Sequence, residues 1–242
     1  MKLIILSDIH ANLTALKAVL KDIQMRKLEN IKFVLLGDTI NYGLRPNETI
    51  NILKGLDTEV AIAGNHEMAL LGVQDDRFSS PRGREILEVT KSIISKENIV
   101  YIDENFSKDY VTKAIDGKQF LFIHGALDDK YWGTINLNNM QDERYKKYDV
   151  VISGHSHKPH FVEIFFEDNN PEKRNKKRTV FINPGSVGQP RNHSSESQYA
   201  IVDTKTLEVT FAKVKYDVVS EQKVFDKYQV DSFYKIRLGD GV

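Results

Sequence analysis

Short apolar runs that each end in a polar or ionisable residue recur along this chain of 242 residues. Such runs, rich in Ile, Val, Leu and Phe, are typical of strands buried on both faces. They lie at positions 3–6, 31–36, 60–63, 120–123 and 150–152. Apolar residues at helical spacing separate them over 12–28, 46–56 and 82–95, with Asn12 or Thr14 as the expected cap of the first helix. Strands that alternate with helices predict βαβ units and a largely parallel sheet.

The pattern changes after Pro159 to meandering β-structure. Strands are predicted over 161–167, 179–182, 198–203 and 208–215, and a helix over about 218–228. The chain contains no linker rich in Pro, Gly or Ser and no internal repeat. We therefore predict one α/β domain over residues 1–242, with a mixed or antiparallel second half.

Composition excludes several classes of function. Lys and Arg together number 34, as do Asp and Glu, and the zero net charge argues against a protein that grips nucleic acid through a bulk positive field. The absence of cysteine excludes disulfides, zinc-thiolate sites and a cysteine nucleophile. Asp8 interrupts the first apolar run, and no run approaches the ~18 apolar residues that span a bilayer. A cytoplasmic protein is expected.

Metal-capable side chains follow these predicted strands at the point where each strand ends. Ligands of open α/β sheets bind outside the carboxyl ends of the strands. Each residue alone has an ordinary explanation, because a strand-end His often only packs and an Asp after Gly often forms a turn. Their repetition at one topological position favours a metal site, and oxygen and imidazole donors suit Mn²⁺, Fe, Zn²⁺ or Ni²⁺. The residues are Asp8, His10, Asp38, Asn65, His66, His124, His155 and His157.

Five motifs built on these residues resemble those of the calcineurin-like metallophosphoesterases. They read Asp8-Ile9-His10, Gly37-Asp38 with Gly43 following, Gly64-Asn65-His66-Glu67, His124-Gly125 and Gly154-His155-Ser156-His157. Segment 183–191 is similar to the tail motif of a bacterial and archaeal phosphodiesterase subgroup, in which some members are described as asymmetrical diadenosine-tetraphosphate hydrolases. Ala11, Leu44 and Glu67 depart from common family residues. The resemblance implies an α/β fold: a four-layer sandwich of two mixed β-sheets flanked by helices.

The resemblance also implies a dinuclear metal centre. Asp8, His10, Asp38 and His157 would hold one ion, and Asp38, Asn65, His124 and His155 the other, with Asp38 bridging. Mn²⁺ is the expected metal, and Fe, Zn²⁺ or Ni²⁺ are alternatives. The implied reaction is hydrolysis of a phosphodiester or nucleotide, diadenosine tetraphosphate being one candidate, by attack of a metal-bridging hydroxide on phosphorus. The catalytic residue His66 would protonate or stabilise the departing oxygen, or else would only orient Asp38.

Four other features each have two interpretations. Arg191 would clamp a substrate phosphate or form a surface salt bridge. Segment 183–191 would present N–H groups to phosphate or serve as a structural turn. Tyr131 and Trp132 would stack on a base or leaving group, or anchor the loop over 126–140. The basic run 173–178 is interpreted as a solvated hairpin tip rather than a nucleic-acid patch.

A non-catalytic scaffold on the same fold is the alternative class of function. Such proteins typically lose the leaving-group histidine, whereas His66 is present here with every ligand. The expected partner is a small phosphoester or nucleotide substrate, with no membrane and no long nucleic acid involved. Unpaired strand edges in the second half are compatible with a homo-oligomer.

Overall fold

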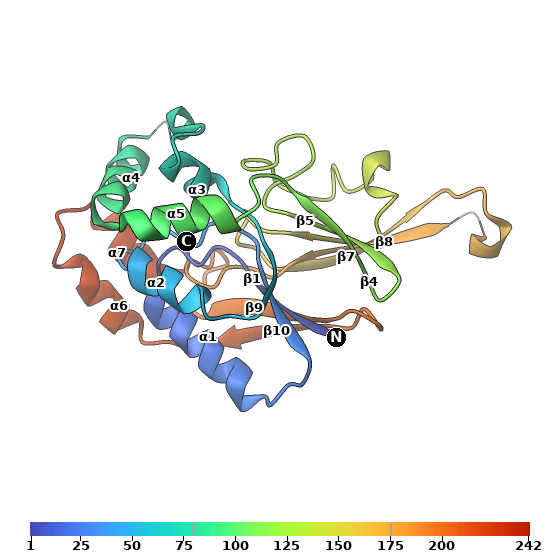
Figure 1. Ribbon diagram of the computed structural model, residues 1–242, viewed down its shortest axis with the longest axis horizontal. Coiled ribbons are helices and arrows are strands. Elements are labelled where there is room, and N and C mark those ends of the chain that lie inside the picture. Colours follow the sequence, from blue (N-terminus) through green and yellow to red (C-terminus); the bar gives the residue numbers. More distant parts are fainter. Residues whose placement is uncertain (79, 175) are drawn as a thin grey trace.

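Two five-stranded β-sheets pack face to face in the computed structural model, which describes residues 1–78, 80–174 and 176–242 (Figure 1). The strands of the first sheet are β1 (Lys2–Leu6), β2 (Ile31–Leu35), β3 (Thr58–Ala61), β9 (Ser197–Asp203) and β10 (Val209–Val214). Their order is β10-β9-β1-β2-β3. Strands β1, β2 and β3 run parallel, and β9 pairs antiparallel with both β1 and β10.

The second sheet is also mixed. Its strands are β4 (Val111–Ile115), β5 (Lys118–Ile123), β6 (Val150–Ser153), β7 (His160–Phe166) and β8 (Lys177–Asn183), in the order β4-β5-β6-β8-β7. The central strands β5, β6 and β8 run parallel, and antiparallel strands form both edges. The parallel pairing predicted from the sequence therefore exists, but it is divided between two sheets.

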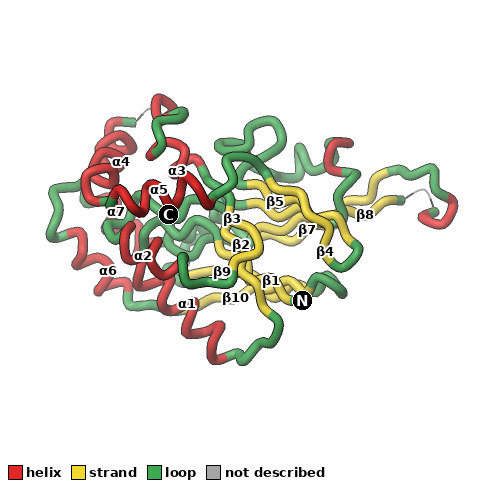
Figure 2. The backbone as a smooth tube through the Cα atoms, viewed as in Figure 1, coloured by secondary structure: helices red, strands yellow, loops and turns green. Residues whose placement is uncertain are grey.

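Helices gather at one end of the sandwich and over the first sheet (Figures 1 and 2). They are α1 (Leu13–Met25), α2 (Pro46–Leu53), α3 (Asn65–Leu70), α4 (Pro81–Ile93), α5 (Lys96–Asn105), α6 (Val218–Phe225) and α7 (Phe233–Asp240). The side chain of Asn12, rather than that of Thr14, caps α1 by accepting from the backbone N–H of Ala15 at 3.0 Å. The expected fold of two mixed sheets flanked by helices is confirmed.

Three apolar clusters hold these layers together. Alternate residues of a strand point to opposite faces, so Leu3 of β1 packs between the sheets with Phe120 of β5. Ile4 points the other way and packs with Leu16 of α1. The outer face of the second sheet is covered by segment 126–148, which brings Tyr145 and its neighbours onto β5, β6 and β8. The strands are thus fixed on both faces, and the loops at their ends start from rigid positions.

None of the helices in the described part of the chain combines the length and the apolar character that crossing a bilayer requires.

Candidate metal centre

Loops from both sheets meet at one place to form the candidate centre. Each loop follows the carboxyl end of a parallel strand, where the sequence predicts metal-capable residues. Strand β1 is followed by Asp8 and His10, β2 by Asp38, β3 by Asn65 and His66, β5 by His124, and β6 by His155 and His157. All of these side chains are buried except that of His155, which is partly exposed. The fold brings the predicted residues together in a single buried cluster.

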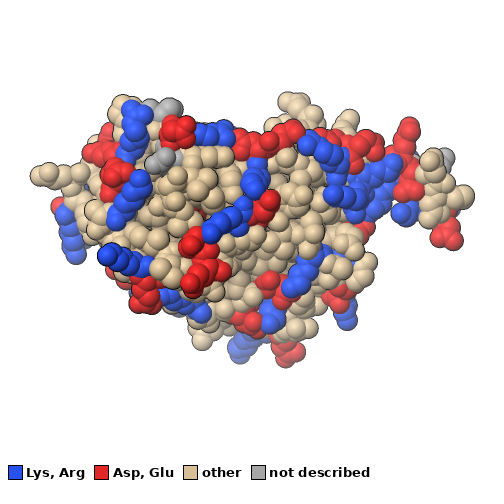
Figure 3. Space-filling model, turned by 45° about the horizontal axis from the view of Figure 1, so that its top comes forward, with Lys and Arg blue, Asp and Glu red and all other residues tan. Residues whose placement is uncertain are grey.

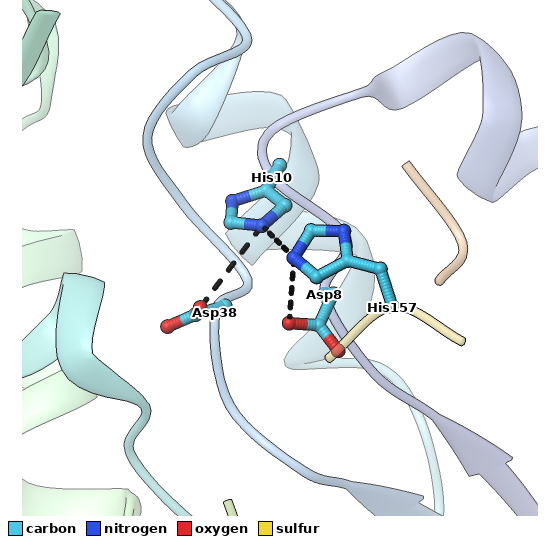
Figure 4. Close-up of side chains that lie close together, drawn as sticks. All are labelled: Asp8, His10, Asp38 and His157. Atoms are coloured by element: carbon cyan, nitrogen blue, oxygen red, sulfur yellow. Dashed lines mark hydrogen bonds and ion pairs between the residues drawn. The ribbon is translucent and has the colours of Figure 1, made fainter. Parts of the chain in front are cut away.

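The first group of donors consists of Asp8, His10, Asp38 and His157, whose ligand atoms all lie within 4.8 Å of one another (Figure 4). The Nε2 atoms of His10 and His157 are 3.3 Å apart, and the latter lies 3.2 Å from Oδ1 of Asp8. Nδ1 of His10 faces the carbonyl oxygen of Ile40 at 3.3 Å, and Nδ1 of His157 faces that of Gln189 at 2.5 Å.

These ring contacts determine where the protons are. A carbonyl oxygen only accepts, so Nδ1 of each ring carries the hydrogen and Nε2 offers a lone pair. Two lone pairs therefore face each other beside Oδ1 of Asp8, which is buried and has no hydrogen-bond partner among the described residues. A metal cation between them would satisfy all three atoms, and this arrangement is typical of histidines that bind a metal.

The second group shares Asp38 with the first and adds His124 and His155, again within 4.8 Å. Nε2 of His124 lies 3.2 Å from Oδ2 of Asp38 and 3.1 Å from Oδ1 of Asn65. Oδ1 of Asn65 also lies 3.1 Å from Nδ1 of His155. Nδ1 of His124 donates to the carbonyl oxygen of Leu36 at 2.6 Å, so in the neutral ring Nε2 carries a lone pair, and it lies among the oxygens of Asp38 and Asn65. The donors fit a second cation.

The electrostatics of the cluster also call for positive charge. Burial raises the pKa of Asp8 to about 7, and the nearby carboxylate of Asp38 acts in the same direction. Burial alone would lower the pKa of His124, but the charge and hydrogen bond of Asp38, the charge of Asp8 and the hydrogen bond to Leu36 together raise that pKa to about 9, so without a metal ion the ring itself carries the positive charge. Two buried carboxylates so close together are costly unless a cation neutralises them.

Glu67 holds the loop that carries Asp38. Its two carboxylate oxygens accept from the backbone N–H groups of Asp38 at 2.7 Å, Thr39 at 2.7 Å and Gly64 at 2.8 Å. Oδ1 of Asp38 accepts from the N–H of His66 at 3.0 Å, which leaves Oδ2 for the shared position. A Cβ atom on Gly64 would lie 2.1 Å from Oδ1 of Asp38, so no larger residue fits there. Glu67, although it departs from the common family residue, thus places a buried carboxylate that holds the loop in position.

His66 differs from the other imidazoles because an amide lies behind its ring. Oδ1 of Asn41 accepts from Oγ1 of Thr90 at 3.0 Å and from the N–H of Tyr42 at 2.7 Å. Its amide group therefore donates to Nδ1 of His66 at 2.7 Å, and the ring proton lies on Nε2, 3.8 Å from Oδ2 of Asp38. Burial lowers the pKa of His66 to about 4, so the ring is neutral and can donate a hydrogen bond.

Sequence analysis missed Asn41, Tyr42 and Thr90. The first two lie inside the second motif, between Asp38 and Gly43, and this position is the signal that could have found them. The Tyr42 ring packs 4.6 Å from the ring of His10 and 4.5 Å from that of His66. The Tyr42 ring therefore contacts both His10, which belongs to the first group of donors, and His66, which belongs to neither group.

The backbone of the centre is unusual. A positive φ is uncommon for residues other than glycine, and such strain clusters at functional sites. Much of the positive-φ backbone in this chain lies in the candidate centre and next to it. The residues are Asp8 (53°), His10 (49°), Ala11 (49°), Asp38 (52°), Asn41 (66°), Tyr42 (63°), His155 (63°) and His157 (58°).

Segment 183–191 returns past the β1 loop, and its main-chain groups serve the turn. The N–H groups of Val187 and Gly188 donate to the carbonyl oxygens of Ser7 and Asp8, each at 3.0 Å. A Cβ atom on Gly188 would lie 1.8 Å from the carbonyl oxygen of Ile9. The structural interpretation of this glycine is therefore correct, and these two N–H groups do not face a phosphate.

A cleft of about 950 Å³ opens beside the centre, between the α3–α4 region and α7. Trp132 lines it, with its ring 5.0 Å from that of Phe78 and 6.2 Å from that of His155. Tyr131 is buried instead, and its hydroxyl donates to the carbonyl oxygen of Lys108. Tyr131 thus anchors its loop, whereas Trp132 faces the cleft.

The two basic features of the sequence have different surroundings. Within run 173–178, whose residue 175 is outside the described part of the chain, Lys173 pairs with Asp168 at 3.3 Å and Arg178 with Glu163 at 2.8 Å. The run lies between β7 and β8 and in the first residues of β8, at the turn of the hairpin that these strands form, as predicted. Arg191 makes no salt bridge with a carboxylate in the described part of the chain; its Nη2 donates to Oε1 of Gln189 at 3.4 Å. The surface salt bridge expected as its alternative role is absent there.

Comparisons with known proteins agree with this geometry. Residues 1–207 match the model of the calcineurin-like phosphoesterase superfamily domain. The uncharacterized protein MJ0912 of Methanocaldococcus jannaschii is 30% identical over 235 residues, which are 92% of this chain and 90% of that protein. A metallophosphoesterase from Sphaerobacter thermophilus has a TM-score of 0.79 and 27% identity, with 100% of both chains covered. The hypothetical protein PH1004 of Pyrococcus horikoshii shares the fold, with a TM-score of 0.81, 20% identity and coverage of 100% of this chain and 98% of that one.

Proposed function

This chain belongs to the calcineurin-like phosphoesterase superfamily, and we propose that it hydrolyses phosphoesters with two divalent transition-metal ions. Asp8, His10, Asp38 and His157 hold the first ion in this proposal. Asp38, Asn65, His124 and His155 hold the second, so that one carboxylate is shared. We propose Mn²⁺ as the metal; Fe, Zn²⁺ and Ni²⁺ also suit a set of imidazole and oxygen donors.

One observation carries the proposal: buried imidazole lone pairs and carboxylate oxygens face one another in two groups that share Asp38. Such ions, when bound, would lower the pKa of a water molecule and neutralise the charge that builds on phosphate oxygens. The protein's own contribution is to fix the donors. Backbone carbonyls behind His10, His124 and His157 set each ring's orientation and leave Nε2 free for the metal.

His66 is the proposed catalytic residue. Nε2 of His66 lies 3.8 Å from Oδ2 of Asp38, and its Nδ1 accepts a hydrogen bond from the side-chain amide of Asn41. A neutral imidazole in this position donates a hydrogen bond to the departing oxygen and can deliver its proton there. The hydrogen bond from the N–H of His66 to Oδ1 of Asp38 comes from the backbone, so the ring remains available for this role.

The size and charge of the surroundings support a small substrate. The cleft beside the centre has a volume of about 950 Å³, which matches the range of small-molecule sites. On the face shown in Figure 3, blue and red side chains are interspersed over most of the surface, and blue side chains gather at the upper right, beside the protruding end of the molecule. A phosphodiester or a nucleotide fits a cleft of this size.

A direct assay distinguishes this proposal from a non-catalytic scaffold. Bis(p-nitrophenyl) phosphate, p-nitrophenyl phosphate and diadenosine tetraphosphate are each tested with Mn²⁺, Ni²⁺, Mg²⁺ or a chelator. We expect chelation to abolish hydrolysis of the preferred substrate and Mn²⁺ to restore it. Hydrolysis that survives complete removal of metal would contradict the proposal. Binding of two ions without turnover of any of these esters would favour the scaffold.

A further inference from the structure

The cleft beside the centre has an aromatic wall. Its rings come from four segments that are far apart in the sequence: the loop after β2, the segment between α3 and α4, the loop after β5, and α7. The last of these lies outside residues 1–207, which match the family model. Such a gathering of rings at a cleft is typical of a surface that binds a ligand. The aromatic lining residues are Tyr42, Phe78, Trp132, Phe233 and Tyr234.

These rings form a row, and His66 lies in the middle of it. On one side, the centre of the Trp132 ring is 5.0 Å from that of Phe78, which in turn is 4.9 Å from the imidazole of His66. On the other side, the Tyr42 ring is 4.5 Å from the same imidazole and stacks on Tyr234 at 5.5 Å. Phe78 and Tyr42 both line the cleft, so the cleft begins one side chain away from the proposed proton donor.

The arginines at the two ends of the row already have partners. At one end, the guanidinium of Arg77 lies 5.0 Å from the centre of the Trp132 ring and has a carboxylate partner at 2.7 Å. At the other end, the guanidinium of Arg82 lies 4.3 Å from the ring of Phe233, and it too has a carboxylate partner at 2.7 Å. The remaining charged residues of the wall have opposite signs, Glu85 and Arg237. What the row offers a ligand is therefore flat apolar surface, which suits an uncharged group with a π face of its own.

We infer that this cleft binds the leaving group of the substrate, and that the leaving group is an alcohol with an aromatic ring, such as a nucleoside. The inference rests on the proposed function of the centre and names its substrate class. Hydroxide formed from water adds to phosphorus, and the P–O bond to the alcohol breaks with its electron pair passing to oxygen. Nε2 of His66 gives its proton to that oxygen, and the proton released from the water later restores the proton of His66.

This step fixes where the alcohol must lie. Its oxygen is at His66 when the bond breaks, so the rest of the alcohol extends over the rings that flank this histidine in the row. Stacking of a base on an aromatic side chain depends little on which base is present, because every base has a π face. The cleft should therefore select for a flat ring and not for one particular base.

The first test needs no catalysis and uses Trp132, the only tryptophan of the chain, as a local probe. Adenosine is titrated into the Mn²⁺-loaded full-length protein while tryptophan fluorescence is recorded, and ribose, which lacks the base, is titrated in parallel. We expect saturable quenching by adenosine and none by ribose. Phe233→Leu should weaken the binding of adenosine at least about fivefold, because one stacking ring is lost. Quenching that does not saturate, or equal effects of the two ligands, would overturn the inference.

Phe165→Leu is the matched control for this test. It makes the same replacement at a phenylalanine that is 57% exposed on β7 and does not line the cleft. Its affinity for adenosine should stay within about twofold of wild type. Equal weakening in the two variants would contradict a role for Phe233. Saturable binding that depends on Phe233, in a protein that hydrolyses no ester, would support the nucleoside site and reject the proposed function.

The second test shows which part of the substrate the cleft takes. Methyl p-nitrophenyl phosphate and bis(p-nitrophenyl) phosphate lose the same leaving group, but only the second keeps an aromatic ring on phosphorus afterwards. We expect Trp132→Leu to lower kcat/KM at least about fivefold for both esters, and Trp132→Phe, which keeps a ring, to lower it less than about threefold.

Two results of this second test would overturn the inference. A loss confined to the bis ester would mean that the cleft takes the retained group, and an unchanged kcat/KM for both esters would mean that it takes neither group. If Trp132→Leu unfolds, Phe233→Leu at the other end of the row takes its place in the comparison.

Discussion

Hydrogen bonds behind the imidazole rings decide what each histidine of the centre can do. His10, His124 and His157 each face a backbone carbonyl through Nδ1, so each presents a lone pair at Nε2. His66 faces an amide N–H of Asn41 and so presents a proton at Nε2. In the proposed centre, one residue type would thus supply both metal ligands and a proton donor, and the difference comes from one neighbouring group.

Replacement of Asn41 by Leu should reduce turnover without removing metal. Without the amide, nothing holds the proton of His66 on Nε2, and the ring is free to take the other tautomer. Loss of such a supporting partner typically costs about 10–100-fold in activity. We expect kcat to fall in this range and the metal content, measured by elemental analysis, to stay at the wild-type level.

Two further variants calibrate this effect. His66→Ala should lower kcat at least as much and keep its metal. Thr90→Val, which removes the hydroxyl that contacts Oδ1 of Asn41 and the carbonyl oxygen of Ile86 within α4, should have a smaller effect. Loss of metal in parallel with loss of turnover would show that Asn41 supports the ligands and not His66. Unchanged turnover in His66→Ala would reduce that residue to a supporting position.

Donor residues could be predicted from the sequence, but their partners could not. Asp8, Asp38 and the strand-end histidines follow apolar runs, so local pattern identifies them. The contact between Asn41 and Thr90 joins residues 49 positions apart. Such a contact depends on how α4 packs over the loop after β2, and no local pattern contains this information.

At the scale of elements, strands with apolar residues on both faces were predicted well, and short or exposed elements were missed. Helix α3 has only six residues, and β4 has three exposed residues in a strand of five. Neither produces the periodicity on which prediction depends. Helices α5 and α7 were missed as well, although α7 has eight residues, the same length as α2 and α6, which were predicted.

The turn that contains Gly188 should not accept a side chain. A Cβ atom there would lie 1.8 Å from the carbonyl oxygen of Ile9, in the loop between Asp8 and His10. We expect Gly188→Ala to lower the free energy of unfolding by about 1–3 kcal/mol, the usual cost of overpacking. The metal content should fall as well, because the β1 loop must move. Denaturant unfolding and elemental analysis measure the two effects.

Gly55→Ala is the matched control, because the added Cβ atom would approach nothing closer than 3.5 Å. Its free energy of unfolding should stay within about 1 kcal/mol of wild type. Equal stability of the two variants would mean that the turn can relax, and the close approach at Gly188 would then have no structural importance.

For the whole molecule, the decisive feature is that the donors come from both sheets. The sequence predicts alternating strands and helices, but it does not show which strand joins which sheet, because that depends on long-range pairing. The resemblance to the phosphoesterase family supplied the two-sheet arrangement. Asp38 follows β2 of the first sheet and His124 follows β5 of the second, so the ions of the proposed centre would connect the two sheets.

Asp38→Ala should therefore remove both ions and the stability that they confer. A ligand that binds only the folded state raises the melting temperature, by about 5–10 °C here at a metal concentration roughly 100 times the dissociation constant. We expect Mn²⁺ to produce this shift in the wild type and none in Asp38→Ala, as measured by calorimetry together with elemental analysis. His193→Ala, at an exposed histidine outside the cluster, should behave as wild type. One ion retained at full affinity in Asp38→Ala would disprove the shared position.

The chain is synthesised from its N-terminus, so the contact between His157 and the carbonyl oxygen of Gln189 can form only late in synthesis. Asp8 leaves the ribosome early. His157, whose ring faces Asp8, and Gln189, whose carbonyl oxygen orients that ring, emerge only after most of the chain has been made. In the proposed centre, the first ion could therefore be bound only after residues 157 and 189 have been made, when segment 183–191 packs against the loop after β1.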